Sequence, residues 1–274
     1  MIAKDFAPSP HLREYISQYR LRHFVFANAI IAPPKPFPPR PEQCVVFYLR
    51  GSETTHYFKD GTKVKKPRSV ISGQFTYRCD RVINDSEILM LMVDFQPGAL
   101  HRLTGIPFVE LTNKDFDAED VLPKIKGLND RLSGTDAYPE IVQLVEQFFT
   151  ELVQSSTPEL LPVDRLLISL KDDPDHSIDW LARHACLSPR QLERKLNERI
   201  GIAPKTYLRI SRFAQSYWLH LKKPSLSWYH IAMTCGYTDY QHLVKDYKAF
   251  AHANPIDFFK EERNAPGRIL GLTK

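Results

Sequence analysis

The chain has 274 residues, 43% of them hydrophobic and 25% charged, and its formal net charge is +5. This composition is typical of folded globular proteins rather than disordered ones, and the length suits about two domains of roughly 100–200 residues each. No apolar run approaches the ~20 residues that a membrane-spanning helix needs, and the first residues lack the apolar core of a secretory signal, so we expect a cytoplasmic protein with no membrane partner.

Roughly the first 130 residues have the pattern of short strands separated by turns. A run of β-branched and aromatic residues over 44–50 ends at a glycine, and Asp60-Gly61 is typical of a tight hairpin turn. Further strands are predicted over 69–73 and 89–95. Evenly spaced short strands of this kind favour a small barrel or sandwich.

Other segments of this half are rich in proline, in basic residues, or in glycine and proline. The stretch 33–41 is dense in proline, which lacks the N–H that a central strand needs, so we expect an extended surface loop there. The basic run 63–68 suits the solvated arm of a hairpin or a second contact to DNA. Glycine and proline at 96–98 and 105–107 predict turns.

From Ala137 the spacing of apolar residues becomes helical. One stripe is formed by Ile141, Leu144, Val145, Phe148 and Leu152. It suits either a dimerisation helix, which would make the protein a homodimer, or a helix packed on its own module. The polar stretch 154–158 then predicts a linker, dividing the chain into a module over residues 1–157 and a domain over residues 158–265.

The C-terminal third repeats itself at an offset of fifty residues. Leu181-Ala182 recurs as Ile231-Ala232, and beyond the next turn the offset is fifty-one, as in Leu192 and Leu243. A single inserted residue between the first and the second helix of the unit explains the shift. Each copy predicts a helix, a tight turn and a second helix, which is the order of a helix-turn-helix unit.

Capping residues stand where these helices should begin and end. In the first copy Ser177 and Ser188 are the predicted N-caps of the two helices, and Gly201 ends the second. In the second copy we expect Gly236 in the turn and Thr238 as the cap of the second helix.

With the apolar positions turned inward, the second helix of each copy keeps a polar outer face. These faces consist of Arg190, Gln191, Arg194 and Lys195 in the first copy, and of Tyr240, Gln241, His242 and Lys245 in the second. Arginine and lysine donate to guanine or phosphate, and glutamine pairs with adenine, so both faces suit a major groove of DNA. The connector from Pro204 would be a helix about 27 Å long. That length suits two reading helices about 34 Å apart, which is one turn of DNA.

The charge distribution agrees with this prediction. Residues 1–163 carry a net charge of −1, residues 164–263 carry +4, and the last eleven residues add two positive charges. A basic excess in the C-terminal third is expected of a domain that faces phosphates.

These motifs resemble the DNA-binding domain of the AraC/XylS family of bacterial transcription regulators. The resemblance covers somewhat more than a third of the chain, and its carriers are 178–182, 187–196, 201–208, 212–213, 231–239, Leu243, Lys245, 247–248 and Asn254-Pro255. The resemblance implies a sequence-specific regulator of transcription that needs no cofactor. Its implied partners are double-stranded DNA and, as for an activator, RNA polymerase. The resemblance also places groove-reading positions at Arg190, Gln191 and Arg194, and at Tyr240, Gln241, His242 and Lys245.

The second copy departs from the family pattern at several positions. His252 stands where the family usually has glycine, so the turn after the second reading helix has to accommodate a side chain. Leu243 and Asp246 also replace commoner residues.

The N-terminal half is similar to a sensor-like module that precedes this domain in one subgroup of the family. The carriers are 39–41, 47–49, 73–74, 93–99, 103–107 and 110–113. The resemblance implies a β-rich regulatory module with a small-molecule effector as a candidate partner. The expected fold is α+β, with an N-terminal barrel-like (cupin-like) module and a C-terminal all-α domain whose two helix-turn-helix units are joined by a long helix.

Two other function classes compete with a regulator. One is a metal-dependent cupin-like enzyme fused to a DNA-binding domain, and the other is an adaptor whose helical domain binds protein. The histidines of the N-terminal half show neither H-x-H nor H-E-x-x-H spacing, and no catalytic serine, phosphate-loop or dinucleotide motif occurs. We therefore expect no catalytic residue and no metal site, with His56 as a half-exposed strand residue.

The four cysteines lie far apart in the sequence and are expected to be reduced thiols. Cys44 suits a thiol sensor, because Arg40 is near in sequence, or a buried and inert thiol within a β-branched run.

Overall fold

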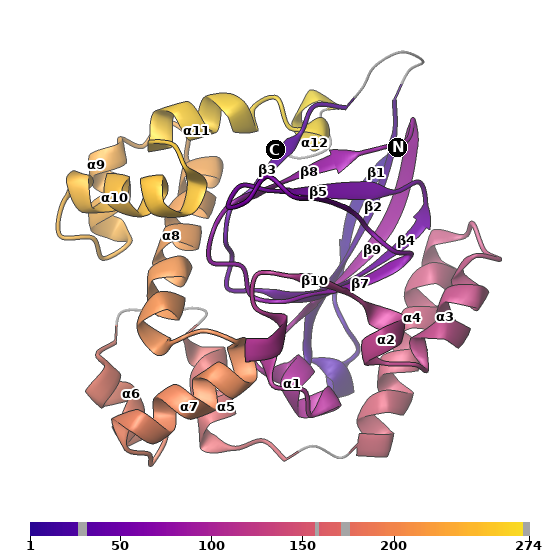
Figure 1. Cartoon of the computed structure of the whole chain (residues 1–274), viewed down its shortest axis with the longest axis horizontal. Helices are drawn as coiled ribbons and strands as arrows, with labels where there is room; N and C mark the ends of the chain where they lie inside the picture. The colour runs from indigo at the N-terminus through magenta and orange to yellow at the C-terminus, as the bar shows by residue number, and fades with distance from the viewer. Residues whose placement is uncertain (27–31, 157–158, 171–175, 271–274) are drawn as a thin grey trace.

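The structure is a computed structural model that describes residues 1–26, 32–156, 159–170 and 176–270. A β-rich N-terminal module is followed by a helical C-terminal domain, as the sequence predicts (Figure 1). The predicted boundary at residues 157 and 158 lies outside the described residues. Within the described ranges no helix has both the length and the apolar character needed to cross a bilayer.

The described part of the N-terminal module forms two antiparallel sheets that face each other (Figure 1). The larger sheet has the order β1 (Ile2–Phe6), β2 (Ile16–Val25), β9 (Glu87–Phe95), β4 (Gln43–Arg50), β7 (Ser69–Ser72) and β10 (Asp115–Asp117). The smaller sheet has the order β3 (Lys35–Phe37), β8 (Cys79–Ile83), β5 (Glu53–Tyr57) and β6 (Lys63–Lys65). The predicted strands over 44–50, 69–73 and 89–95 are confirmed as β4, β7 and β9. His56 is half-buried in β5, as expected.

Strands β4 and β9 read as continuous apolar runs because both of their faces are buried. Successive side chains of a strand point to opposite faces. Val45 of β4 and Leu91 of β9 therefore pack toward helices on the outside of the larger sheet. Val46 of β4 and Met90 of β9 belong to a separate cluster between the sheets.

Helices cover the outer face of the larger sheet. They are the 3₁₀ turns η1 (Pro10–Leu12) and η2 (Phe108–Leu111), and the helices α1 (Ala99–Thr104), α2 (Ala118–Val121), α3 (Ile125–Leu132) and α4 (Tyr138–Ser156). The prediction of only strands and turns before about residue 130 was therefore wrong for α1, α2 and α3. Helix α1 has only 6 residues, too few for an apolar period to show, and the predicted glycine turns are its two ends, Gly98 at φ +81° and Gly105 at φ +71°.

The predicted stripe of α4 lies partly on its own module. Ile141 and Val145 are buried against the larger sheet and its neighbouring helices. Leu144, Phe148 and Leu152 are half-buried at the edge of this contact. Packing on its own module is thus confirmed for the centre of the stripe.

The proline-dense segment differs from the sequence expectation. It contributes an edge strand, β3, which pairs with β8, and Pro36, Pro39 and Arg40 are buried rather than on the surface. An edge strand tolerates proline because one side of it needs no partner. The segment is buried because the C-terminal domain covers it, with Arg40 lying 5.0 Å from the ring of Trp218.

The basic run over 63–68 is also only partly solvated. Lys63 and Lys65 of β6 are exposed as predicted, but Lys66 is buried and forms an ion pair with Asp115 of β10. Burial alone would raise the pKa of Asp115, yet the positive charges of Lys66 and Arg81 outweigh it and lower the pKa to about 2.

This ion pair predicts an acid-sensitive contribution to stability. A carboxyl whose pKa is lower in the folded than in the unfolded protein stabilises above its unfolded pKa, and the contribution is lost as the pH falls toward the folded value. We expect Asp115 to contribute about 2 kcal/mol near pH 6 and to lose about half of it by pH 3. The difference in unfolding free energy between wild type and Asp115→Asn should shrink by about 1 kcal/mol between these pH values. A constant difference in urea titrations would contradict the assignment.

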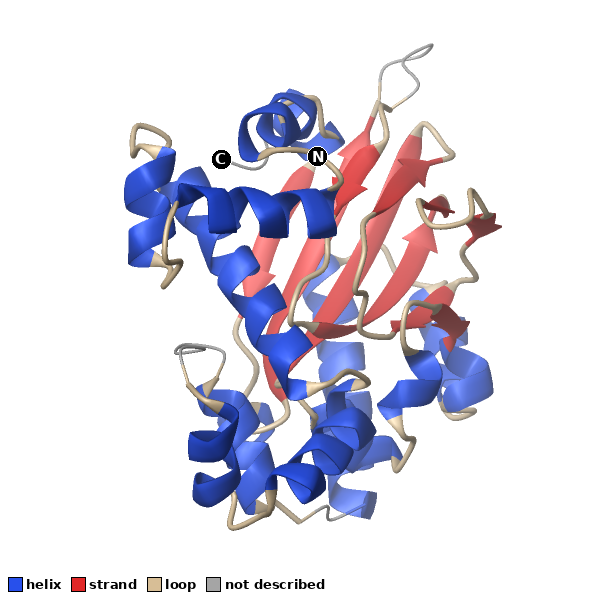
Figure 2. Cartoon of the chain, turned by 60° about the vertical axis from the view of Figure 1, so that its left-hand side comes forward, coloured by secondary structure: helices blue, strands red, loops and turns tan. Residues whose placement is uncertain are grey.

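The C-terminal helices lie beside the sheets of the N-terminal module, and all of them except the last, short one contribute to one hydrophobic core (Figure 2). They are α5 (Pro162–Ser169), α6 (Ile178–His184), α7 (Pro189–Ile200), α8 (Pro204–Lys222), α9 (Trp228–Thr234), α10 (Tyr240–Ala251), α11 (Pro255–Glu262) and α12 (Pro266–Ile269).

Candidate nucleic-acid interface

The first helix-turn-helix unit consists of α6 and α7. The hydroxyl of Ser177 accepts a hydrogen bond from the N–H of Trp180 at 3.2 Å, and that of Ser188 accepts one from the N–H of Gln191 at 3.3 Å. Both predicted N-caps are confirmed, and Gly201 ends α7 with φ +81°. Capped ends fix where each helix starts, and this in turn fixes which side chains of α7 face outward.

The second unit consists of α9 and α10 and repeats this arrangement with one difference. Ser227 caps α9, but the cap of α10 is Asp239, whose carboxylate accepts from the N–H of His242 at 2.7 Å. The prediction of Thr238 as the cap was wrong, because α10 begins one residue later than expected. The hydroxyl of Thr238 lies 2.9 Å from Nδ1 of His242 instead.

The two turns show where the inserted residue of the repeat lies. Cys186 and Gly236 are fifty positions apart and both have positive φ, +55° and +74°. In each turn the next residue donates its N–H five positions back, from Leu187 to Ala182 at 2.9 Å and from Tyr237 to Ala232 at 3.0 Å. The offset is therefore still fifty at this point, and the extra residue stands between Tyr237 and Asp239.

Most of the predicted reading face of α7 is open to solvent. Arg190, Gln191 and Arg194 are exposed, whereas Lys195 is half-buried and pairs with Glu198 at 3.2 Å. Oε1 of Gln191 accepts from the N–H of Ser188 at 2.9 Å, which completes a capping box. Gln191 must release this bond before its amide can pair with adenine through both of its polar atoms.

The predicted face of α10 is less open. Gln241 and Lys245 are exposed, but Tyr240 packs partly on the core and His242 is half-buried with its ring against Tyr237. Lys248, three residues beyond Lys245, is also exposed. Lys248 was not among the predicted reading residues, although spacing of i and i+3 places both lysines on the same side of the helix.

Two of the departures in the second unit have structural explanations. Asp246 is buried and accepts from Nη2 of Arg209 on α8 at 2.6 Å, so it holds α10 against the connector. His252 has φ +56°, the left-handed conformation that favours glycine, and its ring stacks on Phe58 of the N-terminal module with 5.2 Å between centroids. Leu243 is fully buried in the core of the domain.

Helix α8 joins the two units. Its 19 residues correspond to a length of about 28 Å, close to the predicted connector. Helices α6 and α7 lie at one end of α8, and α9 and α10 lie at the other (Figure 1).

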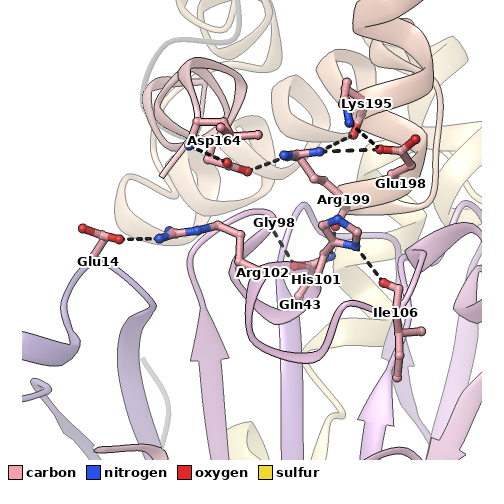
Figure 3. Close-up of polar contacts among 11 residues, drawn as sticks. Glu14, Gln43, Gly98, His101, Arg102, Ile106, Asp164, Lys195, Glu198 and Arg199 are labelled. Carbon is pink, nitrogen blue, oxygen red and sulfur yellow. Dashed lines mark hydrogen bonds and ion pairs between the residues drawn. The ribbon is translucent and has the colours of Figure 1, made fainter. Parts of the chain in front are cut away.

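The C-terminal end of α7 lies against the N-terminal module. Nε2 of Gln43 on β4 donates to the carbonyl of Arg199 at 2.8 Å, and Oε1 of Gln43 accepts from the N–H of Gly98 at 3.1 Å. The guanidinium of Arg199 forms a buried ion pair with Asp164 of α5 at 2.5 Å (Figure 3).

A cavity of about 370 Å³ lies between the two sheets and is bordered by the C-terminal domain. Its apolar lining includes Phe24, Val46, Ile83, Met90 and Met92, and its basic lining includes Arg20, Lys35, Arg40 and Arg81. Burial, with the nearby charge of Arg40, lowers the pKa of Lys35 to about 8. Within the described residues, Nε of Arg40 and both Nε and Nη2 of Arg81 have no hydrogen-bond partner.

Cys44 also lines this cavity. It is buried, and burial raises the pKa of its thiol, with the charge of Asp94 acting in the same direction. A thiol with a raised pKa is mostly protonated and therefore a poor nucleophile. The inert-thiol alternative is thus favoured.

The comparisons with known proteins separate the two halves of the chain. A helix-turn-helix domain model matches residues 181–261, which include α7 to α10. The C-terminal region is an AraC-type helix-turn-helix domain. Residues 4–117, which precede this AraC-type domain, match a domain family of unknown function, DUF6597.

A curated relative is also named as a helix-turn-helix regulator, and two solved structures share the fold. The chain is 31% identical over 113 residues to the HTH-type transcriptional regulator ArgR of Pseudomonas aeruginosa, a match that covers 40% of this chain and 32% of that protein. The chain therefore spans about a third of the length of this relative. The apo form of a single-substitution variant of ToxT from Vibrio cholerae strain SCE256 shares the fold with a TM-score of 0.50 at 11% identity, over 89% of this chain and 97% of that one. The P21 form of Vibrio cholerae ToxT also has a TM-score of 0.50 at 11% identity, over 89% and 98%.

Proposed function

We propose that this protein is a transcription regulator that binds double-stranded DNA sequence-specifically through both helix-turn-helix units. The observation that carries the proposal is the repeated unit itself, since α7 and α10 each follow the same turn geometry and each present exposed polar side chains. We divide the protein into a regulatory module over residues 1–157 and a DNA-binding domain over residues 158–265. RNA polymerase is the protein partner that such a regulator would contact at a promoter.

The proposed base-reading residues are those predicted from the sequence, with roles adjusted to their surroundings. Arg190, Arg194, Gln241 and Lys245 are exposed and can reach base edges or phosphates directly. Gln191 and His242 are held by hydrogen bonds near their own helix N-termini and would contact DNA after these bonds rearrange. Lys195 and Tyr240 are half-buried and suit phosphate contacts at the edge of each groove.

Binding should depend strongly on salt. Each neutralised phosphate releases counterions, so the logarithm of the binding constant falls by about 0.9 per phosphate for each tenfold rise in salt. We expect Lys245→Gln to reduce this slope by about one phosphate equivalent in gel-shift or fluorescence titrations over a salt series. Lys4→Gln, which removes an exposed lysine of β1 in the N-terminal module, is the matched control and should leave the slope unchanged. Equal slopes for wild type and Lys245→Gln would contradict the assignment of Lys245.

We also propose that the cavity between the sheets holds a small-molecule effector with an anionic group and an apolar body. Buried guanidinium nitrogens without partners are costly, and a carboxylate or another anion would satisfy those of Arg40 and Arg81. Apolar side chains such as Val46 and Met90 line the same space.

A thermal-shift comparison tests this proposal. A ligand that binds the folded protein raises its melting temperature. Carboxylic acids of varied skeleton should include binders, while the primary amides of the same skeletons should not bind. Arg81→Met should abolish the shift, and Arg68→Met, which changes a surface ion pair, should retain it. Equal shifts with acids and amides would exclude an anion-specific site.

The half-buried edge of α4 is the surface that we propose for a homodimer. Phe148 and Leu152 border a groove with Leu128 and Arg131 of α3. Analytical ultracentrifugation of wild type and Phe148→Asp/Leu152→Asp tests this. A monomeric wild type would remove the homodimer from the proposal and leave DNA binding by a single chain unaffected.

We assign the protein no catalytic activity. For the alternative of a metal-dependent enzyme, the described residues contain no group of three His, Cys, Asp or Glu side chains placed to hold a metal ion. Metal analysis of the purified protein decides between the two classes, since stoichiometric metal bound to the N-terminal module would favour the enzyme.

A further inference from the structure

We infer that the N-terminal module sets the spacing and phase at which the two reading helices meet DNA, with Gln43 and Arg78 as positioning residues. The inference rests on the proposed function. It assigns the module a role in operator selection that is distinct from holding an effector.

The module caps the C-terminal end of the first reading helix. The last carbonyls of an α-helix have no partner within the helix. At the end of α7 the carbonyl of Arg199 accepts from Nε2 of Gln43 at 2.8 Å, and the carbonyl of the C-cap residue Gly201 accepts from Oγ1 of Thr112 at 2.7 Å. Gln43 is 1% exposed, and its other polar atom is held by the N–H of Gly98, so its amide has a fixed orientation (Figure 3).

The approach at this end is too close to tolerate a shift. A Cβ added at Gly201 would lie 2.5 Å from Oγ1 of Thr112 and 2.6 Å from the carbonyl oxygen of Phe108. The backbone of α7 therefore packs directly on η2 and the residue that follows it. This end of the first unit is fixed to the larger sheet through β4.

The module also caps the C-terminal end of the second reading helix. Nη1 of Arg78 donates to the carbonyl of Ala251, the last residue of α10, at 3.2 Å, and Nη2 pairs with Glu261 of α11 at 2.7 Å. A cation at this end also interacts favourably with the helix dipole. Arg78 lies 4.6 Å from the ring of Phe58, which in turn stacks on His252.

The two contacts come from different sheets. Gln43 is the first residue of β4 in the larger sheet, and Arg78 directly precedes β8 in the smaller sheet. Between them Arg40 lies over the rings of Tyr217 and Trp218 on α8, at 5.3 and 5.0 Å. The module thus holds both reading helices and the connector, and the relative position of the sheets determines that of the helices.

Helix α8 by itself would hold the units less firmly. Long helices curve, and a small bend in a helix of about 28 Å displaces whatever is packed at its ends. One added base pair moves a half-site by about 3.4 Å and rotates it by about 35°. Contacts at three points along the C-terminal domain resist displacements of this size.

The experiment measures how binding responds to operator spacing. A duplex selected from a random DNA library by the full-length chain is the starting probe, and two base pairs are then inserted between its half-sites. We expect wild type to lose at least tenfold in affinity on insertion, and Gln43→Glu/Arg78→Met to lose less than threefold. The glutamate keeps the acceptor for Gly98 but removes the donor to Arg199.

Gln96→Glu and Arg50→Met are the matched controls, because these residues make their contacts within the N-terminal module, and they should retain the wild-type penalty. If the double variant does not fold, the two single variants are used in its place after each has been checked for a cooperative melt. Each single variant should then show an affinity loss between those of wild type and the double variant. An unchanged penalty would overturn the inference. So would tighter binding of the double variant to the original probe, because the contacts would then hold the helices away from DNA. If wild type selects no sequence at all, the proposed function fails instead.

Discussion

Replacing Arg190 and Arg194 by alanine is expected to abolish most of the preference of the protein for its operator over random DNA. Both side chains are exposed on α7 and stand one helical turn apart, so they can reach neighbouring base edges. A bidentate contact between arginine and guanine contributes about 1–3 kcal/mol of discrimination. The two together predict a loss of roughly 30-fold or more, provided that each arginine contacts a base.

Competition gel shifts measure this effect directly, with the selected operator as the probe and random-sequence DNA as competitor. Arg13→Ala/Arg165→Ala removes the same charge from exposed positions before β2 and on α5 and is the control for loss of charge alone. It should weaken binding to both DNAs alike. If Arg190→Ala/Arg194→Ala weakened both equally, these arginines would contact phosphates rather than bases.

Replacing Asp164 by alanine is expected to destabilise the C-terminal domain by about 3–5 kcal/mol, as for other buried ion pairs that lose one partner. Asp164 and Arg199 have side chains that are 1% and 4% exposed, and they are joined at 2.5 Å. Oδ2 of Asp164 also accepts from the N–H of Leu161 at 3.0 Å, which caps α5. The variant leaves the buried guanidinium of Arg199, at the end of α7, with only the longer and partly solvated ion pair to Glu198 at 3.8 Å (Figure 3).

Tryptophan fluorescence during urea unfolding reports on this domain, because Trp180, Trp218 and Trp228 all lie in it. The double variant Asp164→Leu/Arg199→Met removes both charges and should recover much of the lost stability, since apolar residues often replace a buried ion pair without cost. A loss below 1 kcal/mol for Asp164→Ala would mean that water reaches Arg199.

Local signals in the sequence were sufficient to predict the two helix-turn-helix units. The caps Ser177 and Ser188 bond to N–H groups three residues away, so the information that starts each helix is contained in a short segment. The error at Thr238 is of the same local kind, since Asp239 is an equally good cap one residue later. Helix α1 was not predicted because it is too short to show an apolar period, and only the glycines at its two ends mark it.

Burial of polar residues could not be predicted in this way. Lys66 belongs to a basic run that suits a solvated hairpin, yet Asp115 draws it into the interior from 49 residues away. Arg40 and the prolines around it are buried because the C-terminal domain covers them. In each case the decisive neighbour is distant in sequence, and no pattern within the segment indicates it.

Composition predicted a folded chain, and the internal repeat by itself determined that the basic third carries two helix-turn-helix units. Capping and apolar periodicity operate over a few residues, so one chain is enough to show them. The tertiary structure alone decided which side chains hold these units in place. Gln43 and Arg199 are 156 positions apart, and Arg78 and Ala251 are 173 apart. These two contacts form only when the two domains dock, and their partners are fixed by shape and burial rather than by any local pattern.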